Sequence, residues 1–426
     1  MLVRIVVHGT ALLLTAWLAA AQPPSKTLTL EDCIRLAGAA QSSATIARQQ
    51  VEIARLGVTQ ARAGFLPQSR ISNGFTYNSP LLCDRSTFSF VPLNGIREYA
   101  SLFAAGIELD TSGKLRAELA RAHAEQRGAA AGLRLSDRDL KRTVTAAYFR
   151  VLLARHIVEV TRESQAEAQS FEKRVRLLFE NAEAAQADVV KAAAATAFLE
   201  QSLNAAELDA QLAAQELASF WTTEVNEPLP LGDVLVQPIP PPGDRAPGKP
   251  FLKRPEFNLF EAQRQAALAD SRRARADLLP QLGLVFQYGL DSTHVRWSDR
   301  GYATFLTLNV PIFDWLKARG ALRQFQLRAQ QVEDSRAAAE RAFSRDYESA
   351  LVRVRLIYHQ VAITESQVKS SEENLRLSRL RYEGGEGSAL DVVTAQAQLT
   401  QARTNYYAGL SNYLNAKADL EVASGQ

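Results

Sequence analysis

Two long stretches of the chain repeat apolar or small residues at alternating spacings of three and four. In residues 317–382 the repeat runs from Leu322 to Tyr382, with no proline and with glycine at position 320 alone. This spacing is typical of a helix that packs as a coiled coil. At 1.5 Å per residue, a helix of this length extends about 100 Å. Residues 114–179 predict a second rod of equal length.

Four shorter segments alternate with a period of two, which is the pattern of β-strands. The expected strands are residues 69–78, 98–110, 281–291 and 302–313, joined in pairs by loops 79–97 and 292–300. One strand shows a clear apolar face, formed by Leu282, Leu284, Phe286 and Tyr288. Four strands are too few to form a core of their own.

Each rod ends in a turn and a returning helix, so the chain is expected to form two helical hairpins at one end. In the second half, glycines in residues 383–388 favour a left-handed turn, and Ser388 is placed to cap a return helix over 388–423. In the first half, residues 180–184 form the turn, with Asn181 as the expected left-handed residue. The return helix there is expected over 186–221.

The two halves of the chain resemble each other. Residues 61–68 match residues 274–281 at an offset of 213, and the turn-and-helix segments match at an offset of 203. This period is too long for a solenoid unit and indicates a duplication, with a first repeat at 22–226 and a second at 256–426. Each repeat begins with a helix, expected at 30–64 and 255–277, that a Leu-Pro pair ends.

Between the repeats, residues 227–255 contain nine of the 16 prolines in the chain. Proline has no donor N–H and fixes φ, so this segment is expected to be an extended linker that lies against the rods.

The first 21 residues have the pattern of a secretory signal peptide. Arg4 gives a basic start, residues 11–21 are apolar, and residues 19–21 form a small-residue cleavage site. The alternative is an N-terminal membrane anchor, but the apolar stretch is too short to span a bilayer. We therefore expect export. No cysteine follows the cleavage site, so no lipobox is expected.

The composition restricts the function further. Apolar residues make up 46% and charged residues 22%, which is ordinary for an ordered protein. The net charge of +3 gives no reason to expect nucleic-acid binding. The two cysteines, Cys33 and Cys83, are too few for a disulfide scaffold, and the helix expected between them favours two free thiols. Beyond residue 21, no apolar run is long enough for a transmembrane helix.

The chain has no motif that predicts catalysis or a cofactor. Gly106 and Gly113-Lys114 suggest a phosphate-binding loop, but the glycines are seven apart and Leu115 follows the lysine. The histidines beyond the first 21 residues have no metal-ligand spacing: His123, His156, His294 and His359. We expect no enzyme activity, no cofactor and no metal site.

The combination of export, duplication, four strands and two rods resembles the TolC family of outer-membrane efflux proteins. The similarity covers essentially the whole chain after the expected signal peptide. The matching segments are residues 28–37, the Ala-Arg-Ala-x-x-Leu-Pro-Gln segments of both halves, and residues 310–313, 381–388 and 391–393. Each segment alone is weak, but their order and duplication are specific.

The resemblance implies a mostly α-helical fold with a small β part. Three chains would each contribute four strands to a 12-stranded transmembrane β-barrel, and their helices would continue as a coiled-coil α-helical barrel across the periplasm. The apolar strand face would contact lipid. The implied function is a passive channel-tunnel of a tripartite efflux or type I secretion system, with a periplasmic adaptor and an inner-membrane pump as partners. The transported substrate and the pump class are not indicated.

The resemblance also implies roles at the hairpin ends. The residues expected to contact the adaptor are Asn181, Ala182, Glu183, Gly384, Gly385, Glu386 and Gly387. Tyr382 and Asp188 match positions that link hairpins and close the periplasmic mouth. A basic residue of the family's closing network is replaced by Gly387.

At the family's constriction, a ring of carboxylates is expected. Asp391 matches one of its positions, whereas the next position is Thr394 in this chain, so a cation-binding ring should be weaker. For Asp391 and Asp188 the alternative is a helix N-terminal charge that stabilises the helix dipole. For the whole protein, the alternative is a periplasmic coiled-coil structural or adaptor protein that never enters a membrane.

Overall fold

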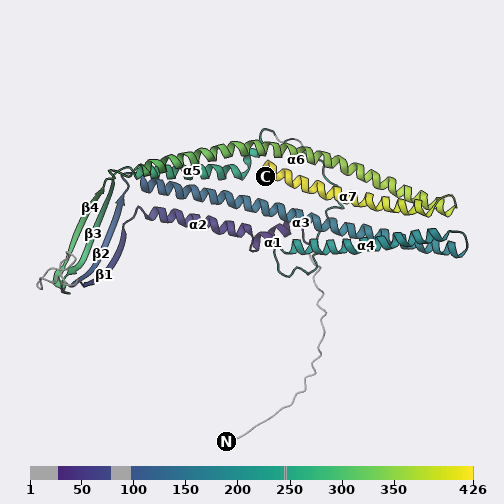
Figure 1. Cartoon of the computed structure of the whole chain (residues 1–426), viewed down its shortest axis with the longest axis horizontal. Helices are drawn as coiled ribbons and strands as arrows, with labels where there is room; N and C mark the ends of the chain where they lie inside the picture. The colour runs from purple at the N-terminus through teal and green to yellow at the C-terminus, as the bar shows by residue number, and fades with distance from the viewer. Residues whose placement is uncertain (1–26, 78–96, 244, 246, 426) are drawn as a thin grey trace, which may run out of the picture.

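The computed structural model describes residues 27–77, 97–243, 245 and 247–425. The molecule is long and narrow, with a small sheet at one end and helices along the rest of its length (Figure 1). The expected signal peptide, Cys83 and all but the last residue of the expected loop 79–97 lie outside the described residues.

The sheet contains four antiparallel strands in chain order. They are β1 (Gln68–Tyr77), β2 (Arg97–Leu109), β3 (Gln281–Ser292) and β4 (Arg300–Asn309). The two inner strands come from different halves of the chain, so the β2–β3 ladder joins the repeats. Within the described chain, β1 and β4 each pair on one side only, which leaves two free sheet edges.

The strand register gives the sheet one apolar face. Residues directly opposite each other lie on the same face, and Phe103 of β2 is opposite both Ile71 of β1 and Tyr288 of β3. Of the four residues expected to face lipid, Leu282 is half-buried, and the other three are exposed, namely Leu284, Phe286 and Tyr288. The opposite face carries mainly small and polar residues, including Gly106, Gly283, Gln287 and Thr307.

Two helices of 67 residues each run from the sheet to the far end, α3 (Lys114–Glu180) and α6 (Lys317–Glu383). They return as α4 (Gln186–Ala218) and α7 (Ala389–Ser424). Near the sheet, α2 (Ser43–Ala63) and α5 (Pro255–Ala276) lie beside them. Both hairpin turns lie at the end opposite the sheet, as the sequence predicts (Figure 1).

The helix expected over 30–64 is wrong as a single element. The structure has α1 (Leu30–Ala39) and α2, separated by a break in which Ala40 is extended. Polar side chains of α2 satisfy the last carbonyls around α1, since the Thr45 hydroxyl donates to Ala40 O and Arg48 donates to Gly38 O. These bonds replace the helical bonds that would continue through the break.

The last strand and the first return helix also differ from expectation. β4 covers Arg300–Asn309 rather than 302–313, because Pro311 has no N–H for the ladder and the chain turns away. Trp315 and Leu316 then take left-handed backbone angles before α6 begins. The helix α4 ends at Ala218 rather than at residue 221, and a turn follows.

The main core lies at mid-length, where the proline-rich linker crosses α3 and α7. Two fully buried tyrosines hold linker carbonyls: Tyr148 donates to Gly232 O at 2.5 Å, and Tyr413 donates to Pro240 O at 2.6 Å. Cys33 is a free thiol in this core, and burial raises its pKa to about 11. Buried hydroxyls with partners are worth about 1 kcal/mol each, so these bonds fix the path of the linker.

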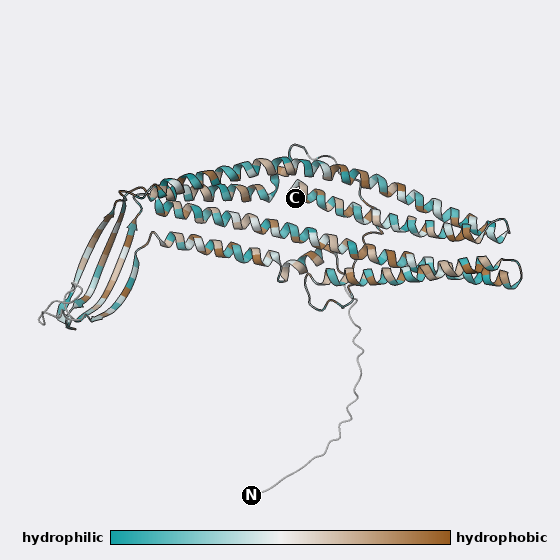
Figure 2. Cartoon of the chain, in the orientation of Figure 1, coloured by the Kyte–Doolittle hydropathy of each residue, from teal (hydrophilic) through white to brown (hydrophobic). Residues whose placement is uncertain are grey.

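Hydrophilic and hydrophobic residues are interleaved along every helix (Figure 2). Among the described residues, none of the helices combines the length and apolar character that a membrane span requires.

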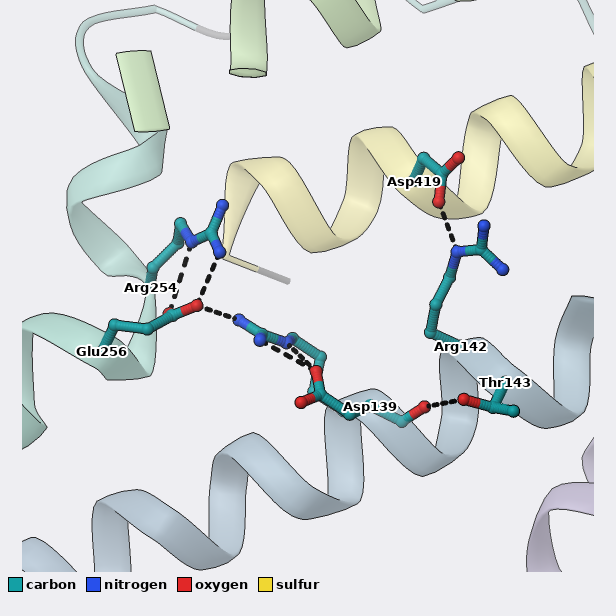
Figure 3. A network of polar contacts seen from close by, with 7 residues as sticks. Asp139, Arg142, Thr143, Arg254, Glu256 and Asp419 are labelled. Atoms are coloured by element: carbon teal, nitrogen blue, oxygen red, sulfur yellow. Dashed lines mark hydrogen bonds and ion pairs between the residues drawn. The ribbon is translucent and has the colours of Figure 1, made fainter. Parts of the chain in front are cut away.

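A network of arginines and carboxylates joins α3, the end of the linker and α7 (Figure 3). Glu256, at the start of α5, accepts hydrogen bonds from Arg254 at 2.5 Å and from Arg138 of α3 at 2.9 Å. Arg142 of α3 pairs with Asp419 of α7. Burial alone would raise the pKa of Glu256, but the bonds from Arg254 and Arg138 outweigh it and lower the pKa.

We expect Glu256→Ala to destabilise the protein, because it removes the carboxylate shared by Arg254 and Arg138, whose side chains are only 11% and 13% exposed, and leaves Arg138 with Asp139 alone. The expected loss in the free energy of unfolding is roughly 3 kcal/mol, measured by urea unfolding followed by circular dichroism. Since the folded pKa is lowered, this contribution is present above the ordinary glutamate pKa and is lost as pH falls through the lowered value.

The matched control is Glu52→Ala, which removes an exposed pair with Arg55 on α2. It should leave the unfolding midpoint nearly unchanged. Equal midpoints for Glu256→Ala and the wild type would show that the network contributes nothing to stability.

Candidate functional site

The first hairpin tip is the turn between α3 and α4, and its three expected contact residues are exposed: Asn181, Ala182 and Glu183. The expectation that Asn181 is left-handed is wrong, because its φ is −84° whereas Ala182 has φ 62°. The Glu183 N–H donates to Leu178 O at 2.8 Å and closes the turn. The left-handed residue of this turn is therefore one position later than expected. An alanine in this conformation costs about 1 kcal/mol relative to glycine.

The second tip, between α6 and α7, is built on glycines. Gly385 has φ 74°, and Glu386 and Gly387 both donate backbone bonds to Arg381 O, at 2.9 and 3.0 Å. A Cβ on Gly387 would lie 3.0 Å from the Tyr382 backbone nitrogen. This close approach gives a physical reason why a basic side chain is absent from this position.

Asp391 caps its own helix. Its carboxylate accepts from the Ser388 N–H at 3.0 Å, and its N–H donates to the Ser388 hydroxyl at 3.2 Å, which is a capping box. The two bonds with Ser388 lower the pKa of Asp391, with a smaller contribution from Arg381. This arrangement matches the alternative of a helix N-terminal charge. Thr394, one turn further along α7, is exposed.

Tyr382 lies between the two hairpins, in a small core of α3, α4, α6 and α7 residues. Its ring contacts Phe171 of α3 edge-on, with 5.3 Å between centroids. Burial raises the pKa of Tyr382, and the charge of Asp188 raises it further. However, the buried hydroxyl has no hydrogen-bond partner among the described residues. Asp188 is half-buried and pairs loosely with Lys191 at 3.8 Å.

Ion pairs between the hairpins surround this tyrosine, and sequence reasoning missed them. Arg379 of α6 pairs with Glu167 of α3 at 3.2 Å, and Arg174 pairs with Glu383 at 3.6 Å. With Tyr382 and Phe171, these four residues line a cavity of about 200 Å³. Nearer mid-length, Arg403 of α7 bridges Glu163 of α3 and Glu372 of α6, at 2.9 Å each. The two residues of each ion pair are far apart in sequence. Charged residues occur all along these helices, so their spacing does not indicate which ones pair across the hairpins.

The structure places Tyr382 in the core between the hairpins and Asp188 in the first turn of α4, without a hydrogen bond between the Tyr382 hydroxyl and any described residue. Asp391 and Thr394 lie at the start of α7, and the tip residues are exposed except Gly387, which is half-buried. Among the described residues, no group of histidine, cysteine and carboxylate side chains is arranged to hold a metal ion.

The chain is similar to known proteins in sequence and in fold. The outer membrane efflux protein family matches residues 39–223 and 251–426. A probable efflux pump outer membrane protein of Pseudomonas putida, SepC, is 24% identical over 336 residues, which cover 77% of this chain and 69% of that protein.

Two solved structures share the fold. The CmeC outer membrane channel of Campylobacter jejuni has a TM-score of 0.82 at 16% identity, over 93% of this chain and 85% of that one. The open state of the MtrE outer membrane channel of Neisseria gonorrhoeae has a TM-score of 0.80 at 21% identity, over 93% of this chain and 88% of that one. Because the family match covers most of the sequence, including both hairpins, the chain belongs to the outer membrane efflux protein family.

Proposed function

We propose that three copies of this chain form a passive outer-membrane channel that conducts substrates out of the cell. One observation carries the proposal: a sheet with one apolar face and two unpaired edges continues into two long helical hairpins. In hydrocarbon, backbone groups at an open edge have no water to bind, so the edges must pair. Pairing β4 of one copy with β1 of the next satisfies both edges.

The resemblance to the TolC family implies three copies, and the strand count supports this number over two. Two copies would supply eight strands, and an eight-stranded barrel is filled by its own side chains. Three copies supply 12 strands, which leaves an interior lined by the small and polar face. The exposed face that includes Leu284, Phe286 and Tyr288 would then contact lipid.

The hairpins would extend into the periplasm and meet partner proteins. The two tips, with Glu183 and Glu386 among their exposed residues, are the proposed contact with a periplasmic adaptor. The adaptor would connect the channel to an inner-membrane pump, which supplies the energy. The similarity to a probable efflux pump outer membrane protein supports this arrangement. The signal peptide proposed for residues 1–21 would direct export.

The alternative, a periplasmic structural or adaptor protein, has less support. It would require the apolar sheet face and both edges to remain in water, where such surfaces promote aggregation. Membership of the outer membrane efflux protein family also favours the channel.

We place the gate of the channel at the junction of the hairpins. Tyr382 and Asp188 come from different hairpins, and the charge of Asp188 acts on Tyr382. The ion pairs of Arg379 and Arg174 hold the same helices together. Loss of these contacts would let the α6–α7 hairpin separate from α3. Asp391 and Thr394 are the proposed pore-lining positions next to this junction.

Fractionation tests the channel proposal. The mature protein should be recovered from outer membranes as trimers that survive detergent without heating, because the shared barrel pairs every strand. Recovery of the protein as a monomer in the soluble periplasm would contradict the proposal.

The gate residues can be tested by conductance. Tyr382→Phe combined with Asp188→Ala should raise the single-channel conductance in planar bilayers, because it removes the two polar groups that we place in the gate. A conductance equal to that of the wild type would remove these residues from the gate.

Charge reversal tests the ion pairs at the junction. Arg379→Glu places two acidic side chains opposite each other, so amide exchange of residues 375–392 should become about two- to fivefold faster by hydrogen-exchange mass spectrometry. Adding Glu167→Arg should restore the wild-type rate, because it re-forms the pair in the opposite sense.

The matched control is Arg376→Glu on the same helix, since Arg376 pairs with Glu373 within α6 and not across the junction. It should leave the exchange of this segment unchanged. Failure of the charge swap to restore protection would show that the pair does not hold the hairpins together.

A further inference from the structure

A groove of about 390 Å³ lies on the apolar face of the sheet, at the end farthest from the helices. Its floor comes from three neighbouring strands, since Ile71, Phe103 and Tyr288 stand opposite one another in the register. Ser101 and Leu290 continue the floor by one further pair. The floor is therefore a fixed part of the sheet rather than of a loop.

The segment between β3 and β4 forms the wall of this groove. Val295 and Trp297 contribute apolar side chains that are 69% and 86% exposed. The wall is held in place by hydrogen bonds within the segment, because the Ser292 hydroxyl donates to Asp299 at 3.2 Å and the Asp299 N–H bonds to Arg296 O at 3.1 Å. The groove thus has an apolar interior before any ligand arrives.

Two guanidinium groups stand at its rim. Arg296 and Arg300 both line the groove, and Arg300 is opposite Leu290 on the apolar face. Across the described chain, neither arginine has an ion pair. The carboxylates nearest in sequence are Asp291, which lies on the opposite face, and Asp299, whose oxygens accept bonds from Ser292 and Ser298. Among the described residues, the rim therefore carries two guanidinium groups without an ion pair beside an apolar floor, and one carboxylate, Asp299, follows Arg296 and precedes Arg300 in the same segment.

We propose that this groove binds a phosphorylated acyl lipid of the outer leaflet, with an acyl chain on the floor and a phosphate on Arg296 and Arg300. Guanidinium groups bind phosphate through paired hydrogen bonds, whereas an apolar floor binds no free anion. A tryptophan at the boundary between apolar and polar zones suits a lipid interface. The proposal rests on the proposed channel, which places this end of the sheet at the outer surface.

A second copy of the chain is not the occupant. The groove lies mainly over β2 and β3, which are paired on both sides within one chain. Copies that join at the edges of β1 and β4 would leave it open. The two arginines, which have no ion pair among the described residues, also favour an anionic ligand over the mixed charges of a protein surface.

The test compares binding of diphosphoryl lipid A with its dephosphorylated form to the purified full-length protein in detergent, by native mass spectrometry. The wild type should bind the phosphorylated form at least tenfold more tightly. Arg296→Gln with Arg300→Gln should abolish this preference. Trp297→Ala should weaken the binding of both lipid forms equally. The matched control is Arg70→Gln, because Arg70 lies on the opposite face of the sheet, in β1. This variant should keep the preference for the phosphorylated form.

Equal binding of the two lipid forms, or an unchanged preference in the double arginine variant, would overturn the proposal. Displacement of the lipid by inorganic phosphate at low millimolar concentration would overturn it in favour of a simple anion site. Conductance in bilayers without lipid A separates this result from the channel itself. A double variant that conducts normally but has lost the preference supports the lipid site, whereas a wild type that forms no trimer or channel contradicts the proposed function instead.

Discussion

The free edges of β1 and β4 impose the constraint on which the rest of this molecule depends. A strand edge exposes unpaired N–H and C=O groups, and a membrane interior offers them no partner. The duplication places one strand pair in each half, and the β2–β3 ladder joins the halves, so that a single chain supplies a wide segment of sheet. The same duplication sets two rods side by side beneath that segment. In the proposed channel, one chain therefore supplies a fraction of the closed barrel.

At the far end, the two hairpins form similar turns with different residues in the left-handed position. The second tip uses glycine for its left-handed residue and again where the chain passes close to Tyr382, whereas the first tip places an alanine in a left-handed conformation. Between the tips, aromatic packing and paired charges hold α3 to α6. Exposed ion pairs of this kind contribute little individually. A junction with such modest contacts is suited to reversible separation.

Much of the architecture was predictable because it rests on periodic patterns. The rods begin where the heptad pattern predicts, and three of the four strands end within one residue of expectation, since periodicity and proline act locally. The break after Ala39 was missed because it depends on Thr45 and Arg48, whose bonds to α1 carbonyls are visible only in three dimensions. The roles of Arg379 and Glu167 were missed for a similar reason, since they meet across 212 positions of sequence.

The segment between β4 and α6 has a consequence for how the protein reaches its destination. Its large apolar side chains are exposed to solvent in a single copy: Ile312 is 95% exposed, Trp315 84% and Phe313 70%. Together with the apolar sheet face, they form a large exposed hydrophobic surface on a single chain in water. Such a surface promotes aggregation of any species that persists in solution. In the proposed channel, a copy that has not yet joined its partners would therefore aggregate unless this surface is covered, so rapid assembly would protect the protein as much as a stable fold does.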